Sequence, residues 1–215
     1  MSTLTRPLAL ALLAGTALVA VGGLVHPMLA GDAAAQLRVI ATTPYWRPLH
    51  LAMLAGCGLV IAGIWVRLAD ERSFAGTVPG PLLAALALVA LGLAVNALNI
   101  AFMAGSGWHM AAMFARGERA MAPLFDATHP IGLMAARFGN FLVALGALAL
   151  GWVEWHDARR PRSLAALAWI AAAGGFVGVL FFSEASRLVL SGVALLSGWQ
   201  VVTAVRALRT PATDT

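Results

Sequence analysis

The sequence contains no lysine, a single cysteine and few charged residues of any kind. Charged residues make up only 11% of the chain, whereas about a quarter of the residues in a soluble domain are charged. The one cysteine, Cys57, excludes an intramolecular disulfide and any CxxC zinc or redox motif. No acidic residue falls in the middle of an apolar run. This absence argues against proton-coupled transport, which typically relies on buried acids near the membrane midplane.

Apolar residues are in excess: they make up 61% of the chain and give it a mean hydropathy of +0.87. Such a composition indicates a membrane protein, and the richness in alanine and arginine is typical of small bacterial ones. The net charge of +5 comes from arginines that mostly lie at the ends of apolar runs, where they anchor to lipid headgroups. The expected partner is therefore the lipid bilayer and not nucleic acid, and a homo-oligomer is left open.

The apolar runs predict an all-α integral membrane protein, a single domain over residues 1–215 built as a bundle of six transmembrane helices. A hydrocarbon core about 30 Å thick needs roughly 20 mostly apolar residues per helix. The runs that meet this standard are 7–28, 48–68, 81–104, 130–153, 164–182 and 188–207. In the alternative, the first run is a signal peptide cut after Ala30, which would leave five spans; the run is longer than a typical signal core.

The arginines predict the orientation of the bundle, because cytoplasmic loops carry an excess of basic residues. One side of the predicted topology carries Arg6, Arg67, Arg72, Arg159, Arg160, Arg162, Arg206 and Arg209. The other side carries Arg38, Arg47, Arg116, Arg119 and Arg187. The larger group, with its DARRPR cluster, favours both termini in the cytoplasm and a multi-pass protein of the cell membrane.

The loops on the outer side predict two short helices. The longest loop, residues 105–129, separates the third and fourth spans, because Pro130 suits the first turn of a helix. Within it, the segment from Trp108 to Met121 has apolar residues near helical spacing and predicts a short amphipathic helix at the membrane interface. A second short helix is expected around AAAQLRVIA, residues 33–41, in the first loop. Together the two helices would partly roof the outer mouth of the bundle.

Four of the five histidines fall on the predicted outer side: His26, His50, His109 and His129. Neutral imidazole is the commonest metal ligand, and it also binds haem iron. Polar side chains also collect at the ends of spans simply because the headgroup region tolerates them. The sequence lacks a diagnostic spacing such as HxxxH or HExxH. Both interpretations, ligands and interfacial residues, therefore stay open.

The second span places soft ligand types on one helical face. His50, Met53 and Cys57 stand at positions i, i+3 and i+7, with His50 outermost. Thioether and thiolate ligands select Cu(I), and imidazole also suits copper, so this face is a candidate copper site. The alternative is that Met53 and Cys57 fill gaps in the core while Gly56 and Gly58 allow a neighbouring helix to approach.

Haem b is the second candidate cofactor, because His26 or His50 could pair with His129 from a facing helix as axial ligands. Arg137, within the fourth span, would then support the site electrostatically, for instance by binding a propionate; the alternative is that it snorkels to the surface. A third option is zinc or iron held by the histidines together with Glu118, Asp126 or Glu184. Each carboxylate has a simpler role, such as capping of the fourth helix by Asp126.

These patterns predict a polytopic membrane protein with a haem- or transition-metal-binding site on its extracytoplasmic side. The candidate ligands are His26, His50, His109, His129, Met53 and Cys57, with Arg137 as support. A redox or electron-transfer role would follow from such a cofactor. The alternative, from a different functional class, is a structural, accessory or transport protein with no cofactor.

Overall fold

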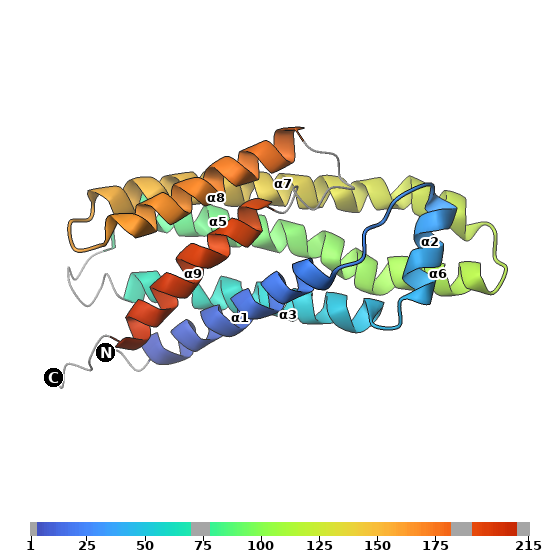
Figure 1. Cartoon of the computed structure of the whole chain (residues 1–215), viewed down its shortest axis with the longest axis horizontal. Helices are drawn as coiled ribbons and strands as arrows, with labels where there is room; N and C mark the ends of the chain where they lie inside the picture. Colours follow the sequence, from blue (N-terminus) through green and yellow to red (C-terminus); the bar gives the residue numbers. More distant parts are fainter. Residues whose placement is uncertain (1–3, 70–77, 182–190, 210–215) are drawn as a thin grey trace.

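The computed structural model describes residues 4–69, 78–181 and 191–209, and these residues are helical apart from short connections (Figure 1). The elements are α1 (Thr5–Val25), α2 (Ala33–Thr42), α3 (Trp46–Gly63), α5 (Gly80–Phe102), the π-helical segment η1 (Met103–Gly107), α6 (Trp108–Ala115), α7 (Met121–His156), α8 (Arg162–Phe181) and α9 (Ser191–Arg209). Within these described residues, five helical stretches are long and apolar enough to cross a membrane: Thr5–Val25, Trp46–Ala69, Gly80–Ala115, Met121–His156 and Arg162–Phe181. The chain is thus an all-helical protein with the features of a multi-pass membrane protein.

The long helices pack in a ring. α3 packs against α1 and α5, α7 packs against α5 and α8, and α9 packs against both α8 and α1 and so closes the ring. The start of α1 and the end of α9 lie at the same end of the bundle (Figure 1). We call this the ion-network end, and we call the opposite end, where α1 ends and α3 begins, the histidine end.

Glycines allow α5 and α7 to approach backbone to backbone. A Cβ atom added to Gly139 would lie 2.6 Å from the carbonyl oxygen of Gly92 and 2.7 Å from the amide nitrogen of Asn96. Helices in lipid have no hydrophobic driving force for association, because lipid tails are as apolar as their side chains, so they associate through such close van der Waals packing. On α3, Gly56 likewise lies against α1, with Leu18 Cβ 2.9 Å from its added Cβ, whereas Gly58 has open space around it.

The prediction of a long third loop over residues 105–129 is wrong. The third span continues through η1 and α6 as far as Ala115, and α7 already begins at Met121. His129 and Pro130 therefore lie inside α7, and Asp126 is an exposed residue of that helix and not its cap. Proline was expected at a first turn because it lacks an amide proton, but spanning helices tolerate it internally where neighbouring groups satisfy the freed backbone.

The two predicted short helices have different outcomes. The first-loop helix is confirmed as α2, whose N-cap residue Asp32 accepts a hydrogen bond of 2.7 Å from the amide of Ala35. The third-loop segment is helical as α6, but it follows the third span directly through the π segment and is not a separate helix between two loops. α2 packs against α6 at the histidine end (Figure 1).

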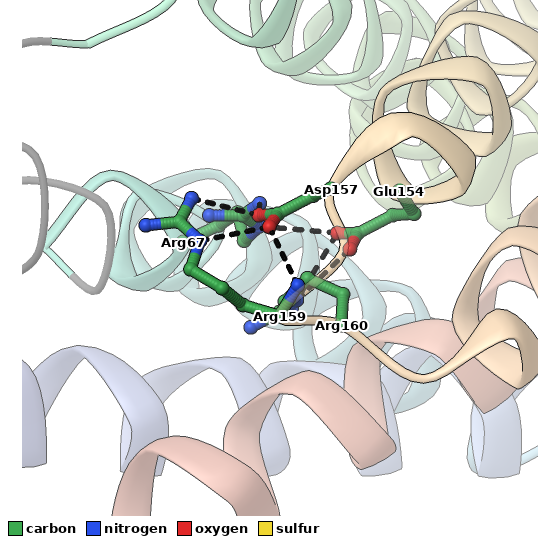
Figure 2. A network of polar contacts seen from close by, with 5 residues as sticks. All are labelled: Arg67, Glu154, Asp157, Arg159 and Arg160. Carbon is green, nitrogen blue, oxygen red and sulfur yellow. Dashed lines mark hydrogen bonds and ion pairs between the residues drawn. The ribbon is translucent and has the colours of Figure 1, made fainter.

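A buried network of ion pairs connects α7 and the segment after it to the end of the second span, at the ion-network end of the bundle (Figure 2). The carboxylate of Glu154 accepts from Nε of Arg67 at 3.1 Å and from Nε of Arg160 at 2.9 Å, and all three side chains are almost fully buried. Asp157 contacts Arg67 at 3.2 Å and Arg159 at 2.8 Å. Hydrogen bonds from Arg159 lower the pKa of the Asp157 carboxyl below its usual value, and the nearby charge of Arg67 adds to this. From the sequence, the DARRPR segment was interpreted only as a cluster of positive charge. The pairing of Glu154 and Asp157 with these arginines and with Arg67 was not predicted.

Candidate functional site

A central cavity of about 530 Å³ occupies the half of the ring nearest the histidine end. Residues of α1, α2, α3, α5, η1, α7 and α9 line it, together with residues of the connection between α1 and α2. The volume falls within the range of roughly 300–1,000 Å³ that small-molecule sites occupy. His26, His50 and His129 all lie on its wall, as do Met53 and Cys57.

His26 and His50 form a direct pair across two helices. Their Nε2 atoms lie 3.1 Å apart, although His26 follows the end of α1 and His50 stands in the first turns of α3. Nδ1 of His50 lies 2.8 Å from the carbonyl oxygen of Trp46. A carbonyl only accepts hydrogen bonds, so Nδ1 carries the proton and the lone pair of a neutral His50 ring sits on Nε2. That lone pair points at His26.

Trp46 holds this pair in place, and sequence reasoning missed it. Its buried indole contacts both imidazoles, with centroid distances of 4.4 Å to His50 and 5.1 Å to His26. Its Nε1 donates to the carbonyl oxygen of Met103, 3.1 Å away, at the start of η1. Single π-helical turns occur frequently at functional sites. The sequence does contain a signal for this contact, because Trp46 stands one helical turn before His50 and so lies on the same face of the helix.

His129 occupies another part of the cavity wall. Its imidazole stacks on Phe125 at 4.5 Å and on Phe102 at 6.3 Å. In the part of the chain that the structure describes, no residue forms a hydrogen bond with this imidazole, and no three His, Cys, Asp or Glu side chains group closely enough to hold a metal ion. The structure therefore does not bring His129 into contact with the pair formed by His26 and His50. His109 is exposed on α6, away from the cavity wall.

The predicted soft face of the second span is present in α3. His50, Met53 and Cys57 are all buried and all line the cavity. Met53 and Cys57 pack together with Ile100 in one apolar cluster. Met103 adds a further thioether to the cavity wall.

Neither Arg137 nor any acidic residue that the structure describes lines the cavity. Nε of Arg137 donates to the carbonyl oxygen of Val179 in α8, 2.8 Å away. Glu118 and Asp126 are exposed, and Glu184 lies outside the described residues. Over residues 4–69, 78–181 and 191–209, the cavity wall contains no arginine, aspartate or glutamate. A haem would therefore find no cationic partner there for its propionates.

Two residues that line the cavity, Gln36 and Asn99, each have a buried side-chain amide oxygen without a hydrogen-bond partner among the described residues. Oδ1 of Asn99 lies against α7, 2.5 Å from a Cβ atom added to Gly132. Buried polar atoms in proteins are nearly always paired with protein or ordered water. No family model, curated protein or solved structure matches this chain.

Proposed function

We propose that the central cavity binds a transition-metal ion through the Nε2 atoms of His26 and His50. The single observation that carries this proposal is the 3.1 Å distance between these atoms. Two nitrogens that bind one tetrahedral ion at about 2.0–2.1 Å lie about 3.3 Å apart, so the separation of the pair suits a shared ion once the rings turn their lone pairs toward it. Histidines that bind metal usually donate their other ring N–H to a carbonyl or carboxylate, as His50 does to Trp46.

The metal site has a defined side of the membrane in the topology that we propose. All six helices of the ring cross the cell membrane, including α9, which packs against both α8 and α1. Both termini lie in the cytoplasm, because the arginine-rich DARRPR segment lies at the ion-network end. The metal ion then binds on the extracytoplasmic side. An ion with two accessible oxidation states in this position gives the protein a redox or electron-transfer role.

Haem b is the second candidate, favoured by the cavity volume and by the imidazole of His129. His129 and His50 come from different helices on the wall of one cavity, as axial ligands must. Against haem stand the direct contact between His26 and His50 and the lack of a cationic side chain on the described cavity wall. The metal ion is therefore the preferred candidate.

Elemental analysis of the detergent-purified, untagged protein, expressed with haem and metals supplied, tests this function. We expect near-stoichiometric transition metal in the wild type and in His109→Ala, whose side chain is exposed on α6. His26→Ala and His50→Ala should lose it while keeping the wild-type elution profile. Iron with a haem spectrum that depends on His129 would select the second candidate. A wild type without metal would overturn both and leave a structural, accessory or transport protein.

A further inference from the structure

Met53 lies on the cavity wall one helical turn farther from the histidine end than His50. On α3 it stands one turn after His50, and on α1 the residue one turn before His26 is Gly22. A Cβ atom added to Gly22 would overlap Cγ of Met53 and lie 2.9 Å from its Sδ. The turn of α1 that contains Gly22 therefore lies beside the turn of α3 that contains Met53. The two imidazoles lie one turn closer to the histidine end, and the Met53 thioether fills the space beside Gly22.

The direction of α3 brings this sulfur toward the imidazoles. One helical turn rises about 5.4 Å, and long side chains in a helix lean back toward its N-terminus. The N-terminus of α3 is at the histidine end (Figure 1), so the general lean of helical side chains directs Met53 toward the turn that carries His50. A methionine with rotatable bonds can cover the remaining distance to an ion held by the pair.

We infer that the ion is Cu(I) and that Met53 supplies a thioether ligand beside the Nε2 atoms of His26 and His50. This inference rests on the proposed function. Thioether ligands select Cu(I), whereas structural zinc is almost always held by four protein ligands. Within the described residues, no group of three His, Cys, Asp or Glu side chains offers zinc such a set. Two imidazoles and one thioether suit a soft ion that accepts few ligands.

Met103 provides a matched control within the same cavity. It is also a buried methionine on the cavity wall, 3% exposed against 7% for Met53. Its Sδ lies against Gly107, 3.2 Å from an added Cβ, and not against the turn below His26. Leucine nearly conserves the volume of methionine, so Met53→Leu and Met103→Leu remove one sulfur each with little change in packing.

Competition titrations of the detergent-purified protein with a chromogenic Cu(I) chelator, under anaerobic reducing conditions, test the inference. Met53→Leu should weaken Cu(I) binding by at least about tenfold, the lower end of what even second-shell changes cost a metal site. Met103→Leu should bind Cu(I) like the wild type. Equal affinities of the two variants would overturn the inference while leaving the proposed function intact. A wild type that binds no metal would overturn both.

X-ray absorption at the copper edge gives a second measurement that does not depend on how a variant folds. The Cu(I)-loaded wild type should show a sulfur neighbour in addition to nitrogen neighbours, and Met103→Leu should show the same. A shell of nitrogen or oxygen alone in the wild type would overturn the assignment of Met53. Persistence of the full sulfur signal in Met53→Leu would overturn it too and would point to Cys57.

Discussion

The indole Nε1 of Trp46 donates a hydrogen bond of 3.1 Å to the carbonyl oxygen of Met103, and this bond joins α3 to the π segment of the third span. The same oxygen accepts the amide of Trp108, an i to i+5 bond that defines the π turn. The carbonyl oxygen of Trp46 in turn fixes Nδ1 of His50. A chain of contacts thus runs from η1 through Trp46 to the imidazole pair, so the π turn helps to set the orientation of His50.

Trp46→Phe should therefore destabilise the protein and weaken metal binding. Phenylalanine removes the donor and replaces the buried indole with a smaller aromatic ring. Interhelical hydrogen bonds in membrane proteins contribute on the order of 1 kcal/mol, and the space left by the smaller ring adds to the loss. The backbone carbonyl of Trp46 that accepts from His50 is kept, so a loss of metal affinity would come from the changed ring contacts with His26 and His50. The free energy of unfolding in detergent and the metal affinity measure the two effects. Trp152→Phe, at a tryptophan that is 63% exposed on α7, is the control and should change neither.

Gly92→Ala should destabilise the contact between α5 and α7. The added Cβ would lie 2.6 Å from the carbonyl oxygen of Gly139 and 2.7 Å from the amide nitrogen of Val143. These are backbone atoms that cannot move aside, and overpacking of this kind typically costs about 1–3 kcal/mol. Gly58→Ala is the control, because an added Cβ there meets no atom within 4 Å. A Gly92→Ala protein with the unfolding midpoint of the wild type would contradict this account of the helix contact.

The sequence predicted the long helices well, because a run of about 20 apolar residues has few other stable arrangements in a membrane protein. It failed where helices extend beyond the hydrocarbon run. Because proline is favoured at the start of a helix, the sequence predicts that the fourth span begins at Pro130. Nothing local in the sequence signals the eight helical residues before His129, from Met121 to Thr128. The π turn at Met103 also has no signal in the spacing of apolar residues.

The candidate site was predictable in kind but not in detail. Helical periodicity alone placed His50, Met53 and Cys57 on one face, and the structure shows that face lining the cavity. The contact between His26 and His50 depends on the relative depth of α1 and α3, which packing of whole helices determines. For the same reason, periodicity could not separate His129 from the pair or show that Arg67 and Glu154 meet, 87 residues apart in the chain.

Glu154→Gln should destabilise the protein strongly. The substitution removes a carboxylate that both buried guanidiniums, of Arg67 and Arg160, contact. Breaking a buried ion pair by removing one partner typically costs about 3–5 kcal/mol, because the remaining charge stays in a poorly solvated place. Chemical denaturation in detergent measures the change. Glu118→Gln, at an exposed position after α6, should leave the free energy of unfolding unchanged. Similar stabilities of the two variants would show that the network adds little.

Asp157→Asn should change how stability depends on pH. The pKa of Asp157 is lower in the folded protein than in the unfolded chain, chiefly because Arg159 donates hydrogen bonds to the carboxylate. The folded state therefore favours the ionised form. This contribution is fully present above the unfolded pKa of about 3.9, and it is lost as the pH falls through the lower pKa of the folded state.

The unfolding midpoints of the wild type and Asp157→Asn, followed in detergent from about pH 7 down to about pH 3, measure this effect. The wild type should be the more stable protein by a constant margin at the upper end. The margin should shrink once the pH falls below about 4, since protonation then removes from the wild type what the substitution has already removed. Arg159 is partly exposed, so added salt should narrow the margin at neutral pH as well. The same experiment with Asp126→Asn, at an exposed acid of α7, should show no such margin at any pH. A margin for Asp157→Asn that persists unchanged into acid would mean that the asparagine disturbs packing, and that the charge of Asp157 is not what stabilises the connection between α7 and α8.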